Sequence, residues 1–191
     1  MPETPEAFWA RTQGALRAPP VEEWDTWPFE GAVTPRALHP PVDAEPRRFG
    51  EGGVDCRRCA EGDAGALWSD EHWIVRTTAE PTGLPMVAFL ETRAHVDFGG
   101  LPDELAIELG PMLLRVQRAV FAVGEIGNVH VCRWGDGSEH LHWWFMARPA
   151  RIPQLIGSFA AIWDDILPVT PDDAWHANLE AMVAALQTET G

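Results

Sequence analysis

The stretch at residues 138–149 reads SEHLHWWFMARP, and it carries more information on fold and function than any other part of the chain. Because successive side chains of a β-strand point to opposite faces, a strand here places His140, His142 and Trp144 on one face. The other face carries apolar side chains that we expect in the core, namely Leu141, Trp143 and Phe145. Buried polar groups need partners, so two imidazoles on one face indicate a site.

The segments on either side of this strand predict a small antiparallel sheet. A tight Gly-rich loop, GDGS at residues 135–138, joins the strand to the one before it. Residues rich in β-branched and aromatic side chains, bounded by turn residues, predict the other strands. These strands are residues 67–68, 72–78, 86–92 and 128–134. The first two read as a hairpin that turns at Asp70 and Glu71.

Apolar residues at helical spacing predict three helices. They cover residues 102–123, with a bend at Gly110 and Pro111, residues 153–167, and a segment that starts at Thr170. In the last of these we expect Thr170 as the N-cap and Pro171 in the first helical position. Strands in one part of the chain and helices around them define an α+β fold, with an antiparallel sheet flanked by helices.

Composition divides the chain into three parts. Residues 1–50 contain nine of the 17 prolines and three tryptophans, Trp9, Trp24 and Trp27. We expect an N-terminal arm there that packs on the core or on a second subunit, because large apolar side chains are costly to expose. Residues 51–150 form the predicted core domain. Residues 151–191 form a C-terminal pair of helices.

The charge and the missing residue types exclude several functions. The chain of 191 residues has a formal net charge of −15, and all 14 of its basic residues are arginine. A surface of that sign repels nucleic acid and anionic membranes. The absence of lysine from the sequence excludes P-loop, Schiff-base and kinase chemistry. Residues 1–20 lack the apolar segment of a signal peptide, so we expect a cytoplasmic protein.

The motif Cys56-Arg-Arg-Cys59 predicts a zinc site, since two thiols at this spacing can bind one ion and a tetrahedral site needs two more ligands. The candidates are His95 and one histidine of the His140–His142 pair, with Cys132 in reserve. The alternative is a redox pair. A thioredoxin-type motif, however, ends a strand and opens a helix in a βαβ unit, which this pattern does not.

The order of these motifs resembles the histidine triad (HIT) superfamily. The matching elements are CRRC, a hairpin, a strand followed by R-A-H, a long helix, and a strand with H-x-H and a later Arg, over residues 56–150. The resemblance is to the zinc-bearing branch that includes the galactose-1-phosphate uridylyltransferases. It implies a HIT-like sheet, a homodimer and a structural zinc held by Cys56, Cys59, His95 and His140.

The resemblance also implies a reaction. His142, the middle residue of the motif, corresponds to the nucleophile that attacks a nucleoside phosphate ester or anhydride and forms a nucleotidyl-histidine. Backbone N–H groups near Gly137 and Ser138 are expected to hold the phosphate, and Arg133 or Arg148 to offset its charge. The third motif position, usually His or Gln, is Trp144 here, and we expect it to line the substrate pocket.

Two other functions are compatible with the sequence. In the first, Trp144 fills the phosphate site and the chain is a non-catalytic, zinc-stabilised binding protein. In the second, the same pocket takes a substrate that is not a nucleotide, and His142 acts as a general acid or base. All three functions share a small-molecule ligand and the same four metal ligands.

Overall fold

The computed structural model describes residues 23–24, 27, 29–31, 39–155 and 157–188. The chain divides into two units, Met1–Arg47 and Arg48–Gly191, so the second unit begins three residues before the core boundary expected at residue 51. In the first unit, the Trp27 N–H donates to the Trp24 carbonyl at 2.9 Å, and the Trp27 and Phe29 rings meet edge to face. Trp9 lies outside the described residues.

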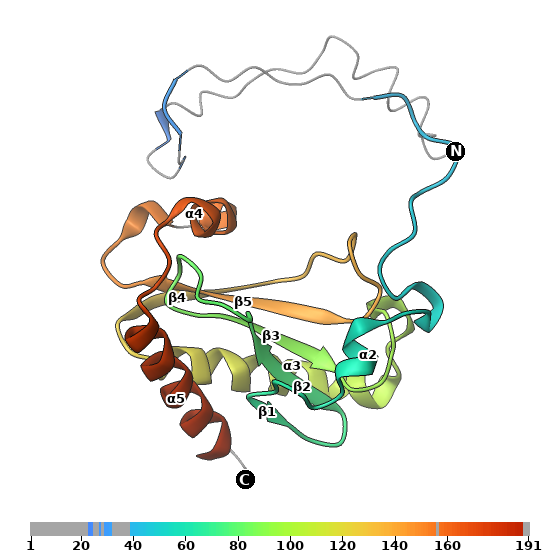
Figure 1. Ribbon diagram of the computed structural model, residues 1–191. Coiled ribbons are helices and arrows are strands. Elements are labelled where there is room, and N and C mark those ends of the chain that lie inside the picture. The colour runs from blue at the N-terminus through green and yellow to red at the C-terminus, as the bar shows by residue number, and fades with distance from the viewer. Residues whose placement is uncertain (1–22, 25–26, 28, 32–38, 156, 189–191) are drawn as a thin grey trace. The chain divides into compact units, whose positions relative to one another are not determined.

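The second unit is built on one antiparallel sheet of five strands in the order β1-β2-β3-β5-β4 (Figure 1). The strands are β1 (Trp68–Ser69), β2 (Trp73–Thr77), β3 (Val87–Thr92), β4 (Ile126–Cys132) and β5 (His142–Pro149). Each one overlaps a strand that the sequence predicts. The α+β prediction is therefore confirmed, and the motif strand β5 lies inside the sheet, between β3 and β4.

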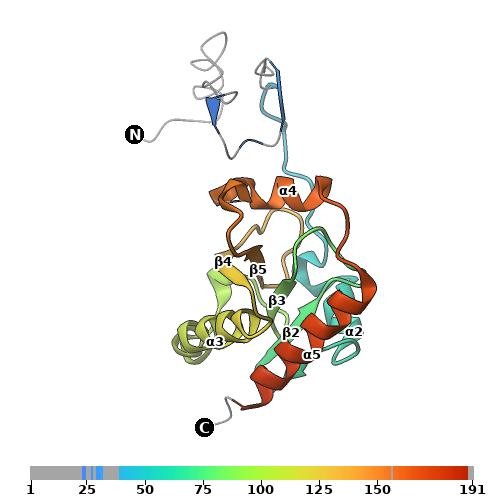
Figure 2. The ribbon, with the colours of Figure 1, turned by 90° about the vertical axis from the view of Figure 1, so that its left-hand side faces the viewer.

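Helices α3 (Asp103–Phe121) and α5 (Asp172–Thr188) cover one face of the sheet (Figures 1 and 2). The main core lies between this face and the helices. Phe145 and Ala147 of β5 are fully buried in it, together with Leu90 of β3 and Val116 of α3. Phe145 confirms the expected alternation, since apolar side chains at alternate positions of β5 point into this core.

The opposite face of the sheet carries the site and is covered by other elements. These are α2 (Arg57–Glu61) near one end of the sheet and α4 (Ala160–Ile166), which lies across the sheet from α3 and α5 (Figures 1 and 2). A second, smaller core has formed under the C-terminal segment, where Leu155 packs with Leu84, Phe89 and Met146. None of the helices among the described residues has the length and apolarity that crossing a membrane requires.

The C-terminal helices differ from their predictions. Residues 153–167 form two short 3₁₀ turns, Pro153–Leu155 and Gly157–Phe159, before α4 begins. The predicted single helix is wrong because Gly157 has a φ of +69°, in the left-handed region, which interrupts an α-helix. Thr170 does not cap α5, since its hydroxyl donates to the Leu84 carbonyl at 3.0 Å and the helix starts at Asp172. Helix α3 runs as one helix through Pro111.

The loop before β3 holds the C-terminal segment on the sheet. The Leu84 N–H donates to the Asp164 carboxylate at 2.7 Å, and the Thr170 N–H donates to the Thr82 carbonyl at 2.7 Å. Gly83 lies so close to α4 that a Cβ atom there would be 2.6 Å from the Leu167 Cβ and 2.7 Å from the Asp164 carbonyl oxygen. The chain can approach this closely only because position 83 has no side chain.

We expect the substitution Gly83→Ala to displace α4 and to lower the free energy of unfolding by about 1–3 kcal/mol, because backbone atoms must move to admit the methyl group. Chemical denaturation followed by circular dichroism measures this change. The matched control is Gly110→Ala on the exposed side of α3, where a Cβ meets nothing within 4 Å. Alanine there should stabilise the helix by about 1 kcal/mol. Equal effects of the two variants would contradict the close approach of α4.

Candidate metal centre and histidine site

Four side chains from separate elements place their ligand atoms together. Cys56 precedes α2 and Cys59 lies within it, while His95 follows β3 and His140 precedes β5. Their ligand atoms all lie within 4.8 Å of one another. The Cys56 Sγ is 3.4 Å from the His140 Nδ1, and the Cys59 Sγ is 3.6 Å from the Nδ1 atoms of both histidines.

The spacing of these atoms fits zinc. Tetrahedral bonds of about 2.3 Å to sulfur and 2.05 Å to nitrogen separate sulfur from nitrogen by about 3.6 Å. The three sulfur–nitrogen distances of 3.4, 3.6 and 3.6 Å agree with that value. Two thiols and two imidazoles also form a Cys₂His₂ donor set typical of structural zinc. The residues present therefore fit a four-coordinate zinc ion with no open position.

Each histidine of the cluster is oriented by a second hydrogen bond. The His140 Nε2–H donates to the Thr92 carbonyl at 2.7 Å, and the His95 Nε2 lies 3.2 Å from the Glu139 carboxylate. Since a carbonyl only accepts, His140 carries its proton on Nε2 and directs the Nδ1 lone pair towards the thiols. Such outer partners fix the tautomer and the ring orientation of metal-bound histidines.

Burial and local charge shift the pKa values of these groups. Burial lowers the pKa of His140, which favours the neutral imidazole that a metal requires. Burial and the neighbouring Cys56 thiol raise the pKa of Cys59 to about 11. Burial opposes the Cys56 thiolate as well, but hydrogen bonds from Cys59 outweigh it and lower the pKa of Cys56. Cys56 and Cys59 lie close together, and the Cys59 thiol resists ionisation. A bound cation would stabilise both groups as thiolates.

The segment of chain that leads into Cys56 makes a turn that depends on a glycine. Gly50 has a φ of +74°, and a Cβ there would lie 3.1 Å from the Cys56 Cβ and 3.2 Å from its Sγ. The Gly52 N–H donates to the Glu139 carboxylate, the same group that orients His95. The turn therefore closes over the cysteine and supports one outer partner of the cluster.

His142 begins strand β5, with its side chain on the sheet face opposite α3. Its Nδ1–H donates to the carbonyl oxygen of His140 at 2.8 Å. A carbonyl accepts only, so the proton lies on Nδ1 and the neutral ring keeps a lone pair on Nε2. His142 is half-buried, and Glu91 of β3 lies directly across the sheet from it.

Trp144 lies next to His142 on the same face, within a group of aromatic rings. Its ring centroid is 4.6 Å from that of Phe89, 5.5 Å from that of Trp134 and 6.2 Å from that of His142. Among the described residues its indole Nε1 is buried and has no hydrogen-bond partner. A buried N–H group without a partner is uncommon in folded proteins and requires an explanation.

A buried ion pair occupies the sheet beside His142. Arg76 and Glu91 are 3% and 1% exposed, and their side chains meet at 3.1 Å. Arg76 also donates to the carbonyls of Gly62 and Ala64, which ties the chain after α2 to the sheet. Glu91 makes a second ion pair with Arg58 at 3.0 Å. No local pattern in the sequence indicates this network, because charged residues within strands 72–78 and 86–92 carry no periodic signal.

The loop at residues 135–138 pairs with residues that the sequence analysis assigned to the arm. The Phe49 N–H donates to the Gly137 carbonyl, and the Glu139 N–H donates to the Phe49 carbonyl, both at 3.0 Å. The Ser138 hydroxyl lies 3.5 Å from the same Phe49 oxygen. The Arg48 side chain donates to the Gly135 carbonyl. This segment therefore holds the loop in place, and no local motif in the sequence indicates it.

The two arginines expected near the phosphate have other partners. Arg133 pairs with Asp97, which also pairs with Arg48. Arg148 lies six residues along β5 from His142, about 20 Å at the usual rise of a strand, and its guanidinium donates to the Pro149 carbonyl at 3.1 Å. We therefore leave both out of the proposed substrate site.

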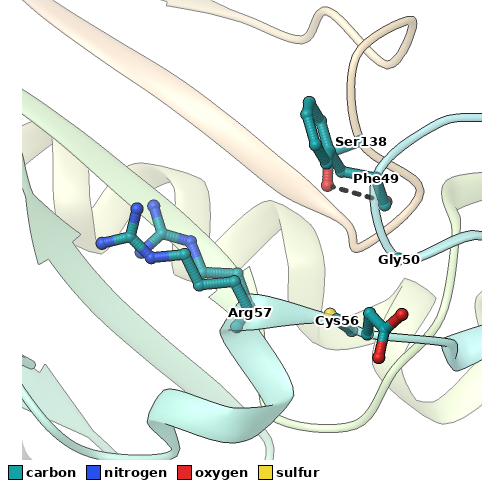
Figure 3. A pocket seen from close by; sticks show the side chains of 7 residues that line it. Phe49, Gly50, Cys56, Arg57 and Ser138 are labelled. Carbon is teal, nitrogen blue, oxygen red and sulfur yellow. Dashed lines mark hydrogen bonds between the residues drawn. The ribbon is translucent and has the colours of Figure 1, made fainter.

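Two other arginines belong to the CRRC motif. Arg57 and Arg58 line a cavity of about 270 Å³ with Cys56 and Ser138. Figure 3 shows Arg57, Cys56 and Ser138 around it. In that view the Arg57 side chain points away from Cys56, and Ser138 and Phe49 face the cavity from its other side. Arg58 also contacts Glu91, the residue across from His142. The cavity therefore lies between the metal cluster and the loop before His140.

Cys132, the reserve metal ligand, is not part of the cluster. It lies on β4 directly across from Trp144. Burial raises the pKa of its thiol.

The chain has the histidine triad fold. No model of a known protein family and no curated protein sequence matches it, but solved structures do. A histidine triad nucleotide-binding protein from Sulfolobus tokodaii has a TM-score of 0.52 at 13% identity, covering 70% of this chain and 93% of that one. A histidine triad protein from Marinobacter aquaeolei has a TM-score of 0.51 at 17% identity, covering 70% and 95%. The resemblance predicted from the motifs is thus confirmed as a fold.

A further match is more distant. A structure of a uridylyltransferase has a TM-score of 0.45 and 17% identity, covering 72% of this chain and 46% of that one.

We expect the purified chain to carry one zinc ion, and Cys56→Ser to lose it with a large drop in the melting temperature, because structural zinc contributes on the order of 10 kcal/mol to folding. Glu139→Gln should keep the fold and weaken zinc binding about 10- to 100-fold. Native mass spectrometry and a competition titration with a chelator measure stoichiometry and affinity.

Cys132→Ser is the matched control, since it removes a thiol outside the cluster. It should bind zinc as the wild type does. Loss of zinc in this variant, or a zinc-free Cys56→Ser protein of unchanged stability, would contradict the assigned ligands.

Proposed function

We propose that the chain is a nucleotidyl hydrolase or transferase in which His142 is the nucleophile. The observation that carries the proposal is the hydrogen bond from the His142 Nδ1–H to the His140 carbonyl at 2.8 Å. That bond fixes the tautomer whose Nε2 carries a lone pair, and it holds the ring rigidly on the strand. An oriented, neutral imidazole is a competent nucleophile at neutral pH.

The proposed reaction has two steps, and each step forms one bond to phosphorus and breaks another. The Nε2 lone pair attacks the phosphorus of a nucleoside phosphate ester or anhydride, and the bond from phosphorus to the leaving group breaks. The leaving group departs with the bonding electrons. Water or a second phosphate then attacks the phosphorus of the nucleotidyl-histidine, the phosphorus–nitrogen bond breaks, and its electron pair returns to Nε2; a proton is released when water is the acceptor. The Nδ1 proton stays on the ring and keeps its hydrogen bond to the His140 carbonyl, which stabilises positive charge on the ring.

Zinc would be held by Cys56, Cys59, His95 and His140, and with four protein ligands it supplies rigidity to the chain around His140.

Charge near the cavity of Figure 3 supports an anionic substrate. Arg57, Arg58 and Ser138 line it together with Asp55, and guanidinium groups bind phosphate oxygens well. Both arginines pair with Glu61 in the absence of substrate, and Arg58 also pairs with Glu91. The backbone of Gly137 and Ser138 forms part of the loop fastened by Phe49. We propose that the transferred phosphate binds between this loop and the two arginines. Arg57 and Arg58 then take the role expected of Arg133 and Arg148.

Trp144 retains one function of the residue that it replaces. The third position of the motif normally donates to the phosphate, and the indole Nε1 is a donor without a partner among the described residues. We propose that it donates to a substrate oxygen. The packing of Trp144 against Phe89 and Trp134 also favours the second candidate, a binding protein without turnover, because the ring fills space beside His142.

The homodimer stays a prediction. Its best support is a row of exposed apolar side chains on α3 at seven-residue spacing, with Ile107 78% exposed, Leu114 52% and Phe121 39%. Residues at this spacing lie on one side of a helix. An apolar row on a helix that already covers the core on its other side is typical of an interface.

We expect the wild type to release a nucleoside monophosphate from at least one member of a panel of nucleotide sugars, dinucleoside polyphosphates and nucleoside phosphoramidates. His142→Ala should lower the rate by at least about 10³-fold, because removing a nucleophile removes the covalent pathway. Mass spectrometry of the products, and of the intact protein for a nucleotidyl adduct, measures both.

The matched control is His176→Ala, which removes an exposed histidine on α5. It should leave turnover unchanged. Equal product from wild type and His142→Ala would reject the mechanism, and tight nucleotide binding by a wild type that forms no product would favour the binding protein.

A further inference from the structure

Arg48 bridges the two segments of chain that carry the histidines of the metal cluster. Its Nη1–H donates to the Asp97 carboxylate at 2.7 Å, and Asp97 lies two residues after His95. Its Nη2 lies 3.5 Å from the Glu139 carboxylate, and Glu139 directly precedes His140. One guanidinium group therefore contacts both the chain after the first histidine and the chain before the second.

The two oxygens of the Glu139 carboxylate have different partners. Arg48 lies against Oε1, whereas Oε2 lies 3.2 Å from the His95 Nε2 and accepts the Gly52 N–H. A carboxylate that is held at one oxygen cannot rotate freely about its last side-chain bond. Arg48 therefore directs the other oxygen towards His95, whose Nδ1 faces the Cys59 thiol at 3.6 Å.

Neighbouring contacts keep the Arg48 side chain in this position. The Arg48 backbone N–H donates to the Glu51 carboxylate at 3.0 Å, and Phe49 pairs with the loop at residues 135–138. The Nη1–H also donates to the Gly135 carbonyl at 3.1 Å. A guanidinium group donates in several fixed directions, whereas the ammonium group of lysine is a single point of charge. The position therefore suits arginine and not merely a cation.

Partial burial makes this network stronger than an ion pair on the open surface. The side chains of Arg48, Asp97 and Glu139 are 27%, 26% and 21% exposed. Fully exposed pairs contribute little because water and salt screen them, but charges that form a network contribute more. Arg133 adds a second cation on Asp97. The network can therefore hold the geometry of the chain around the cluster.

We infer that Arg48 is a positioning residue of the metal centre and that it acts on His95 through Glu139. It is not one of the four ligands. The inference goes beyond the proposed function, since it concerns zinc binding and holds whether or not His142 is a nucleophile. Outer partners of metal-bound histidines change metal affinity about 10- to 100-fold, and a residue that orients such a partner shares in that effect.

A competition titration of the full chain with zinc and a chelator tests the inference. Arg48→Met, which keeps the length of the side chain and removes its charge, should weaken zinc binding about 10-fold. In a Glu139→Ala background the same change should add less than about 2-fold, because Arg48 has no carboxylate left to orient. A general loss of folding stability would instead weaken binding equally in both backgrounds.

The matched control is Arg151→Met, which removes an exposed ion pair with Glu125 at 3.4 Å and should leave zinc affinity unchanged. Arg48→Lys serves if Arg48→Met does not fold. It keeps the charge but not the several directions of donation, so it should weaken zinc binding about 3-fold, again only where Glu139 is present.

His142→Ala should bind zinc as the wild type does, so failure of the proposed chemistry leaves the inference standing. The inference is overturned by unchanged zinc affinity in Arg48→Met, by an equal loss in the wild-type and Glu139→Ala backgrounds, or by a wild type that binds no zinc.

Discussion

His140 joins the two halves of the site through three separate contacts. Its Nε2–H donates to the Thr92 carbonyl, its Nδ1 faces the two thiols, and its own carbonyl accepts the Nδ1–H of His142. The metal cluster and the proposed nucleophile both contact His140, the cluster through its ring and His142 through its backbone carbonyl. In the proposed mechanism a shift of His140 would move His142, so a four-ligand zinc site would support the chemistry without contact to substrate.

The two faces of the sheet carry different kinds of side chain. The face under α3 and α5 is a continuous apolar core with Phe145 fully buried. The other face carries ionisable and aromatic groups, and two separate covers shape it. One is α2, fastened by Arg58 and Arg76 to the buried Glu91. The other is the α4 segment, fastened through Asp164 to Leu84.

The sequence predicted what local patterns encode, namely the strands, the alternation in β5 and the four ligand atoms that the structure brings together. It did not predict the pairing of Phe49 with the loop before His140, because the partners are 88 to 90 residues apart and neither side has a distinctive pattern. The break at Gly157 was not predicted, because apolar residues continue at helical spacing on both sides of it. The buried Glu91 was not predicted, because it lies within a strand pattern. Long-range contacts decide such positions, and local propensity does not.

X-ray absorption at the zinc edge of the metal-loaded chain tests the central claim most directly, that His140 belongs to a Cys₂His₂ zinc site. The account predicts two sulfur neighbours at about 2.3 Å and two imidazole nitrogens at about 2.0 Å, with no open position. His140→Ala should lower the number of imidazole neighbours from two to one, with a water oxygen in the fourth position. A wild-type shell with three sulfurs, or one that His140→Ala leaves unchanged, would contradict it.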